Sequence, residues 1–419
     1  MIRSRAAGVL TVAGSLVLML SLLGFLGPLT WWFDLLANFK LQFLLGLAVI
    51  GAALMTLGRT GTAAVMLGGA MLNIAVIAPL YYRSPADPQP DAPEITVVGY
   101  NIQIGNRVPR LGWALDGDPD VVFLFETGRA HLADLEERFP DHHVRSGIYE
   151  GRNYGVTILT TVDVEVELLE FARAAGDAVR LELAFGDGTV VVYGVHPPSP
   201  TNAADTAYRD DVLARVGRAV AEETDPVIVV GDLNATPWSN GFRNLTGPGD
   251  LVNSLEGFGY GASWPTRLPA IARIPIDHVL HTRQLTVISR QLGPATEASD
   301  HRPVRVRLTM AASPGIAQDR SSSPTAPDAV DSHEAFTMAL RRLYPGGRML
   351  GPMSESTALI GTKVSARRRR PKAVDGVRIC SARSCTTRLS RYNRNGTCHM
   401  HSPITFPRVR GRDVPVIDV

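Results

Sequence analysis

Carboxylate, amide and imidazole side chains accompany four strand-like apolar runs in the middle of this chain. Leu124–Glu126 ends one run, His196 follows a second, Gly231–Asn234 ends a third, and Ser299–Pro303 precedes a fourth. Metal-assisted cleavage of a phosphate ester needs oxygen ligands for a hard cation, a base for water, and donors for phosphate oxygens. The order of the four fragments, and their repeated place at strand ends, predict this chemistry.

The elements that must position these groups lie between residues 95 and 309. Their β-branched and apolar content predicts strands, and helical patterns occur between some of them. Nearly continuous apolar runs suit strands covered on both faces, so we expect an α/β sandwich with helices outside paired sheets. The predicted strands are Ile95–Tyr100, Val121–Phe125, Val156–Leu159, Thr189–Val195 and Val227–Val230, and the predicted helices are Ala130–Arg138 and Tyr208–Glu223.

The succession of polar residues resembles the endonuclease/exonuclease/phosphatase superfamily over residues 94–309. That resemblance implies a four-layer α/β sandwich of the DNase I-like type, and Trp264-Pro265 is similar to the membrane-tethered bacterial branch. The matching elements are Asn101, Glu126, His196, Gly231-Asp232-Leu233-Asn234, Asp277 and Ser299-Asp300-His301.

The resemblance also implies roles for these residues. Asn101, Glu126 and Asp300 would hold Mg²⁺ or Mn²⁺, with Glu126 as the principal ligand, because Gln103 stands where some relatives carry an acid. Whether one or two ions bind is left open. The implied catalytic residues are His196 on the leaving-group side, Asp232 and Asn234 for the water and a phosphate oxygen, and His301 oriented by Asp277. His278, beside Asp277, is interpreted as structural.

Charge is distributed unevenly along the chain. Residues 95–309 hold 19 Lys and Arg against 28 Asp and Glu, whereas residues 311–419 hold 18 against 8. An acidic body argues against tight, sequence-independent binding of DNA, which normally uses a basic face.

Three apolar runs precede the body: Ala6–Leu26, Leu41–Leu57 and Thr62–Leu80. Their length is that of membrane-spanning helices. A secretory signal peptide competes as an interpretation of the first run, and a buried soluble bundle as an interpretation of all three. The two later runs and the very short connections favour three spans.

The orientation follows from the arginines that flank the spans. Arg3 and Arg5 before the first span, and Arg59 between the second and third, favour a cytoplasmic N-terminus. The stretch Trp31–Lys40 would then lie at the outer surface, and everything after Leu80 would lie outside the cytoplasm.

Residues 380–401 contain a candidate metal site. Cys380, Cys385, Cys398 and His401 supply three thiolates and an imidazole, a complete tetrahedral set for structural Zn²⁺, and His399 could replace His401. A disulfide between any two cysteines would leave the third unpaired. Reduced zinc thiolates are typical of the cytoplasm, which conflicts with the predicted orientation, and the sequence leaves this conflict open.

The sequence therefore predicts a membrane-anchored, Mg²⁺-dependent phosphoesterase whose catalytic domain faces the outside. Its partners would be the lipid bilayer and a phosphate ester, either a lipid head group, a small phosphoester or a nucleic acid; no protein partner is indicated. A nuclease acting on external DNA or RNA is one alternative, and a non-catalytic membrane scaffold on the same fold is another. We divide the chain into three transmembrane helices (1–83), a Pro-rich tether (84–93), the catalytic domain (94–309), a disordered basic linker (310–375), a zinc-binding module (376–405) and a tail (406–419).

Overall fold

The computed structural model describes residues 2–103, 111–147, 155–171 and 174–312, with 378–381, 385 and 388–389 near the C-terminus. The chain divides into two units, Met1–Ser321 and Ser322–Val419. In the second unit, strands β13 (Arg378–Ile379) and β14 (Arg388–Leu389) pair antiparallel.

The predicted zinc ligands belong to this second unit. Cys380 is buried and Cys385 is partly exposed. Cys398 and His401 lie outside the described residues, as do residues 313–375 of the linker predicted to be disordered. The zinc site therefore stays a prediction. The first residues of that predicted linker belong to the first unit instead, because strand β12 (Val304–Met310) ends at Met310 and the backbone N–H of Ala311 donates to the carbonyl oxygen of Gln284.

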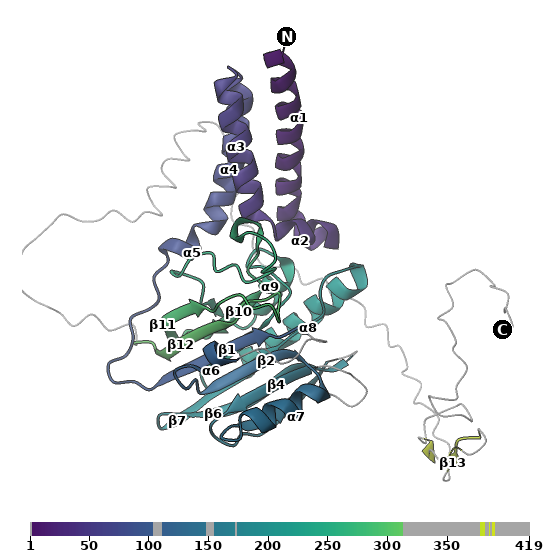
Figure 1. Ribbon diagram of the computed structural model, residues 1–419, viewed down its shortest axis with the longest axis vertical. Coiled ribbons are helices and arrows are strands. Elements are labelled where there is room, and N and C mark those ends of the chain that lie inside the picture. Colours follow the sequence, from purple (N-terminus) through teal and green to yellow (C-terminus); the bar gives the residue numbers. More distant parts are fainter. Residues whose placement is uncertain are drawn as a thin grey trace, which may run out of the picture. The chain divides into compact units, whose positions relative to one another are not determined.

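Two six-stranded mixed sheets form the centre of the first unit (Figure 1). The first has the order β11-β12-β1-β2-β4-β3 and the second β5-β6-β7-β8-β10-β9. Each contains one parallel pair, β1 with β2 and β7 with β8. The strands are β1 (Glu94–Asn101), β2 (Val121–Thr127), β3 (His143–Ser146), β4 (Gly155–Thr160), β5 (Val166–Phe171), β6 (Ala174–Phe185), β7 (Gly188–Val195), β8 (Val227–Asp232), β9 (Val252–Asn253), β10 (Asp277–His281), β11 (Leu285–Leu292) and β12 (Val304–Met310).

The sheets pack face to face through one apolar core and carry helices on their outer faces. Val97 of β1 and Phe123 of β2 belong to the same buried cluster as Val192 of β7 and Val230 of β8. A second cluster joins β7 and β8 to helices α8 (Ala203–Glu222) and α9 (Asn240–Thr246). A third joins β1 and β2 to α6 (Gly112–Leu115) and α7 (Arg129–Arg138). The order helix, sheet, sheet, helix is the four-layer sandwich that the sequence predicts.

All five predicted strands and both predicted helices are present, with ends that differ by a few residues. Helix α8 begins at Ala203, five residues before the predicted start, because the Asn202 side chain accepts hydrogen bonds from the backbone N–H groups of Ala204 and Asp205. This side-chain cap satisfies N–H groups that have no partner within the helix.

The N-terminal helices stand together on one side of the sandwich (Figure 1). Two of them, Arg3–Leu29 and Thr60–Ile77, are long and apolar enough to cross a membrane. The bent pair Trp31–Ala37 and Lys40–Thr56, with 69° between its halves, makes a third if it is one span. The helical segments are α1 (Ile2–Leu23), η1 (Gly24–Leu29), α2 (Trp31–Ala37), α3 (Lys40–Thr56), α4 (Thr60–Ile77) and α5 (Pro79–Tyr82), followed in the sandwich by η2 (Ala270–Ala272).

The predicted tether, residues 84–93, is bonded to the α/β domain. The Gln89 N–H donates to the carbonyl oxygen of Met310 at 2.8 Å, and the Ala86 carbonyl accepts from the hydroxyl of Thr286. The segment therefore runs along the sandwich and is held to it by hydrogen bonds at these points.

Candidate active site

The predicted site residues meet where β1, β2, β7 and β8 end. In the first sheet, Asn101 pairs with Phe125 in the residue register, so the last residue of β1 lies beside the end of β2. In the second sheet, Asp277 of β10 lies opposite Asp232 of β8. Because the two sheets face each other, these strand ends bring both sets of polar groups to one edge of the sandwich.

Glu126 has a backbone conformation that the sequence did not indicate. Its φ is 59°, and the register of β2 with β4 shifts between Phe125 and Thr127. A left-handed glutamate within a strand is uncommon, and such residues concentrate at functional sites. The bulge brings the Glu126 carboxylate to the site, where it lies close to His196 and Asp232.

Gly231 permits the close approach of β8 to β7 beside the site. A side-chain carbon at this position would lie 1.9 Å from the carbonyl oxygen of Val195. Only glycine fits here, so the glycine of the Gly231–Asn234 fragment places Asp232 directly at the end of β7.

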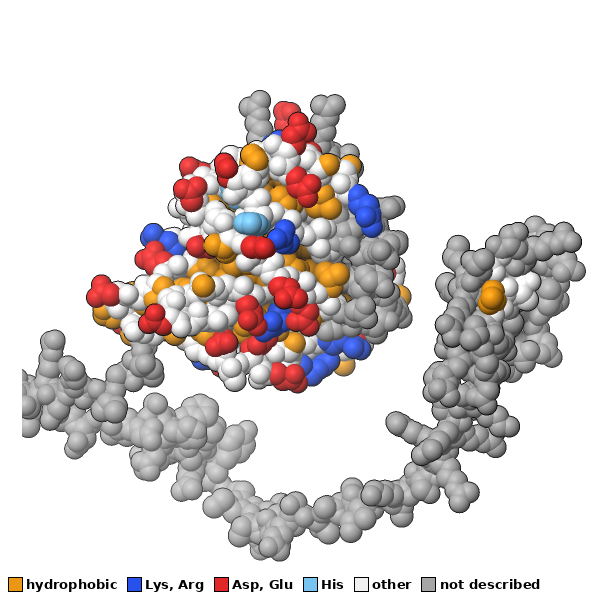
Figure 2. Space-filling model, turned by 90° about the horizontal axis from the view of Figure 1, so that it is seen from below, with side chains coloured by type: hydrophobic (Ala, Val, Ile, Leu, Met, Phe, Trp, Pro, Cys, Tyr) orange, Lys and Arg blue, Asp and Glu red, His pale blue; other side chains and the backbone are white. Residues whose placement is uncertain are grey.

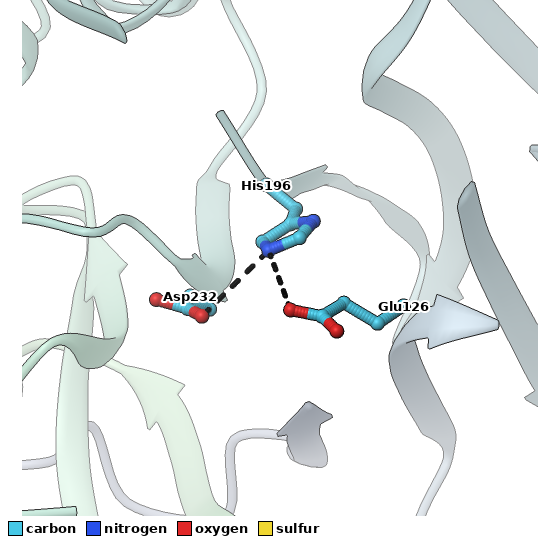
Figure 3. A group of neighbouring side chains, drawn as sticks. All are labelled: Glu126, His196 and Asp232. Carbon is cyan, nitrogen blue, oxygen red and sulfur yellow. Dashed lines mark ion pairs between the residues drawn. The ribbon is translucent and has the colours of Figure 1, made fainter. Parts of the chain in front are cut away.

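Glu126, His196 and Asp232 point toward one another (Figure 3). The Nε2 atom of His196 lies 3.8 Å from Oε1 of Glu126 and 3.7 Å from Oδ2 of Asp232. One ligand atom from each of the three lies within 4.8 Å of the others. Two carboxylates at this separation repel each other unless a cation or a proton lies between them, and an oxygen-rich donor set suits Mg²⁺ or Mn²⁺.

Asn101 connects the two carboxylates. Its Nδ2 donates to Glu126 Oε1 and to Asp232 Oδ2, both at 2.9 Å, while its Oδ1 accepts from the backbone N–H of Gln103. In this arrangement the amide presents its nitrogen to the carboxylates. Asn101 therefore orients the two carboxylates in this structure. To act as the predicted metal ligand, its side-chain amide would have to rotate so that Oδ1 faces the ion.

His301 is held by a buried acid, as the sequence predicts. Its Nδ1 lies 2.9 Å from Asp277 Oδ2, and its Nε2 lies 3.7 Å from Asp232 Oδ2. Ser299, whose role the sequence left unassigned, accepts from the backbone N–H of His301 and donates to the carbonyl oxygen of Asn101. This hydroxyl ties the segment that carries His301 to the end of β1.

Asn234 and Asp300 occupy the border of the site. Ser199 donates to Asn234 Oδ1 at 3.0 Å, and Asn234 Nδ2 donates to the carbonyl oxygen of Pro197. The indole N–H of Trp264 donates to Asp300 Oδ2 at 3.1 Å. Ser199 was missed by the sequence analysis, although it follows two prolines directly after His196.

Burial and mutual charge set the protonation of the central groups. Burial raises the pKa of Asp232, while the neighbouring His301 opposes this change. Burial alone would lower the pKa of His301, but the surrounding carboxylates, Asp277 foremost, overcome it and raise that pKa to about 10. His301 is thus an imidazolium at neutral pH in this arrangement and can donate a hydrogen bond from Nε2.

His278 lies on the other face of β10, because successive side chains of a strand alternate. Its ring packs 4.9 Å from that of Phe242 in α9, and Nε2 lies 2.9 Å from the carbonyl oxygen of Ala235. Burial lowers its pKa to about 4. These contacts agree with the structural role that the sequence suggests for this histidine.

This burial predicts an acid-sensitive contribution to stability. Between about pH 6.5 and about pH 4, the His278 imidazole binds a proton in the unfolded chain but stays neutral in the folded chain. The stability of the folded chain should therefore fall by as much as about 1.4 kcal/mol per pH unit through this group. Unfolding free energies of wild type and His278→Gln, measured in urea across this range, should converge as the pH falls. A constant difference would contradict the prediction.

A cleft of about 460 Å³ contains the site. Its lining includes residues of the α/β domain and also Leu35, Asn38 and Phe39 from α2 and the turn that follows it. No pattern in the sequence indicates that this turn reaches the site. The other lining residues are Gln103, Glu126, Ser199, Pro200, Thr201, Asp232, Asn234, Trp264, Ile274, Ile276, Asp300 and His301.

Residues 101–301 match the endonuclease/exonuclease/phosphatase family, the family that the sequence resembles. The matched segment begins at Asn101 and ends at His301, so it contains every predicted site residue of the domain. Members of the family are hydrolases that act on phosphoester bonds.

Several solved structures are similar to the chain. TDP2 of D. rerio, complexed with a single-strand DNA product, is 17% identical over 52% of this chain and 99% of its own, with a TM-score of 0.43. An endonuclease/exonuclease/phosphatase from Beutenbergia cavernae is 19% identical over 52% of this chain and 72% of its own, with a TM-score of 0.40. A phosphatase from Neisseria bound to a product DNA hairpin is 18% identical over 51% and 98%, with a TM-score of 0.41. No curated protein matches the chain.

Proposed function

We propose that the chain is a metal-dependent phosphoesterase, anchored to a membrane by its N-terminal helices, with its α/β domain outside the cytoplasm. The observation that supports this most is the meeting of Glu126, Asp232 and His301 in one cleft, with the Nε2 atom of the His196 imidazole 3.8 Å and 3.7 Å from the first two carboxylates. Acids, an amide and imidazoles brought together from five separate strand ends are costly to bury unless they serve chemistry.

Each residue has a task in the proposed hydrolysis. Glu126 would hold the ion, with Asp300 nearby, and Asn101 would fix the direction of the Glu126 carboxylate. When bound, the ion supplies positive charge that offsets the negative charge developing on the phosphoryl oxygens. Asp232 and Asn234 would hold the attacking water in line with the leaving group.

The two histidines would act on opposite sides of the phosphorus. His301, kept cationic by Asp277, would donate from Nε2 to a phosphoryl oxygen. His196 would give a proton to the departing alkoxide. One P–O bond forms from water, whose proton would pass to the Asp232 carboxylate, and one P–O ester bond breaks. The leaving group departs as an alcohol with the proton from His196.

One described face of the domain lacks a feature that would support the nuclease alternative. The face of the domain turned away from the helices carries acidic and basic side chains side by side, without a broad basic area among its described residues (Figure 2). Nucleic-acid binding relies on such an area. Plasmid DNA and RNA are still included among the substrates tested, so that nuclease activity would be detected.

The test is hydrolysis by the detergent-solubilised full chain with and without metal. Substrates are bis(p-nitrophenyl) phosphate, p-nitrophenyl phosphate, plasmid DNA and RNA. We expect EDTA to lower the rate at least about a hundredfold and Mg²⁺ or Mn²⁺ to restore it, because charge neutralisation at phosphorus supplies several kcal/mol. Equal rates with and without EDTA, or no hydrolysis of any ester, would overturn the proposal.

A further inference from the structure

The cleft has two kinds of wall. One belongs to the α/β domain and carries the acids and histidines. The other is formed by Leu35, Asn38 and Phe39. These three residues follow the first candidate span, α1 with η1. Leu35 lies in α2, and Asn38 and Phe39 lie at the break between α2 and α3, two helices that make a further candidate span if the bent pair is one span. The second wall is therefore next to the candidate membrane spans in the chain.

Buried polar contacts fasten this wall to the domain. Asp34 of α2 accepts from Arg209 of α8 at 2.6 Å, and both side chains are at most 3% exposed. The Asn38 side chain accepts from the hydroxyl of Thr236 at 2.8 Å. Gln42, in the first turn of α3, donates to the carbonyl oxygen of Ile271 at 3.0 Å. The wall is thus fixed in place by contacts on both sides of Phe39.

The same wall is joined to the catalytic groups. Besides its bond to Asp34, Arg209 donates from Nη1 to the backbone carbonyl oxygen of Asn234 at 3.0 Å. One buried guanidinium therefore positions both α2 and the loop that carries Asp232 and Asn234. Because the same guanidinium holds α2 and the backbone of Asn234, the wall formed by Leu35, Asn38 and Phe39 is part of the substrate cleft.

Apolar side chains lie along the border of the cleft that is nearest to the N-terminal helices. Phe39 is 37% exposed and Ile271 is 63% exposed, while Leu35 and Ile274 line the cleft itself. Water-soluble proteins seldom leave such groups at the mouth of a polar site unless they meet an apolar partner. With the N-terminal helices in a membrane, as proposed, these apolar groups would lie on the side of the cleft toward the bilayer, opposite the acids and histidines.

We infer that the substrate is a lipid phosphate ester, which enters from the membrane with its phosphate at the acid and histidine cluster and its hydrocarbon part against Leu35 and Phe39. This inference rests on the proposed function. Hydrolysis then releases an alcohol and a phosphate, one of which keeps the hydrocarbon chain and returns to the bilayer. Leu35 and Phe39 determine specificity and do not touch the phosphorus.

The test uses two diesters that differ only in the apolar part, p-nitrophenyl hexadecyl phosphate and p-nitrophenyl methyl phosphate. The full chain is reconstituted in phosphatidylcholine vesicles with Mg²⁺ or Mn²⁺, and kcat/KM is measured for both. Both esters release the same p-nitrophenolate, so the ratio of the two values reports recognition of the chain. Partition of the hexadecyl ester into vesicles is the same for every variant.

We expect Phe39→Ser and Leu35→Ser each to lower the hexadecyl-to-methyl ratio about tenfold, as is usual when an apolar contact to substrate is lost. Leu29→Ser is the matched control, because Leu29 is 73% exposed at the end of the first span and is not among the cleft residues. It should keep the wild-type ratio. A variant that fails to fold is recognised because it hydrolyses neither the hexadecyl nor the methyl ester. The ratio measured for the other cleft variant then tests the inference.

Two results would overturn the inference. One is an unchanged ratio in both cleft variants. The other is faster hydrolysis of plasmid DNA or RNA than of the hexadecyl ester, which would leave the phosphoesterase proposal intact. Absence of hydrolysis of both diesters and of nucleic acids would overturn the proposed function itself.

Discussion

Replacing Glu126 by glutamine should lower kcat about a hundredfold to a thousandfold and raise the concentration of Mg²⁺ or Mn²⁺ needed for half-maximal activity. Glutamine has the same shape but no charge, so the contact with Asn101 at Oε1 can persist while the negative charge for the cation is lost. The measurement is the initial rate of bis(p-nitrophenyl) phosphate hydrolysis across a metal titration.

The control for this variant is Glu94→Gln. Glu94 begins β1 and pairs with Arg307 on the surface, where its side chain is 49% exposed. Loss of such a pair changes stability little and leaves the cleft intact. If Glu126→Gln has the activity and metal dependence of Glu94→Gln, the assignment of Glu126 is wrong.

Replacing Arg209 by methionine should destabilise the chain by about 3–5 kcal/mol, because Asp34 then remains buried, and Asp210 partly buried, without their cationic partner. The guanidinium is fully buried and bonds to both carboxylates, at 2.6 Å and 2.7 Å. Urea unfolding in detergent, followed by tryptophan fluorescence, measures this loss. Activity should fall as well, since Arg209 also holds the backbone of Asn234.

Arg215→Met provides the comparison on the same helix. Arg215 pairs with Asp211 one turn away, and both side chains are about two-fifths exposed. Its loss should change the unfolding free energy by less than about 0.5 kcal/mol. Equal destabilisation by the two variants would show that α2 is not fastened through Arg209.

Local patterns were enough to predict the sandwich and the set of polar residues. Residues Val121–Phe125 of β2, which precede Glu126, and all of β8, which ends at Asp232, are buried, so their composition reveals them without knowledge of their neighbours. A polar residue that follows such an apolar run can also be identified from the sequence alone. The family resemblance added their order, and the match of residues 101–301 agrees with it.

Local patterns could not predict how those residues face one another. The amide of Asn101 as a link between two carboxylates, the left-handed backbone of Glu126 and the contact of Ser299 with Asn101 all depend on the register between strands. That register joins residues as far apart as 198 positions in the chain. Neither the composition of the sequence nor the spacing of its residues predicts this register.

The residues along the chain are sufficient to predict the proposed chemistry, because apolar strands that end in acids, amides and histidines follow runs long enough to cross a membrane. Only the tertiary structure decided that the turn between two of those runs closes the cleft. The physical reason is the buried pair of Asp34 and Arg209, which are 175 residues apart. An acid in the short stretch between two apolar runs indicates no contact until folding places a guanidinium against it.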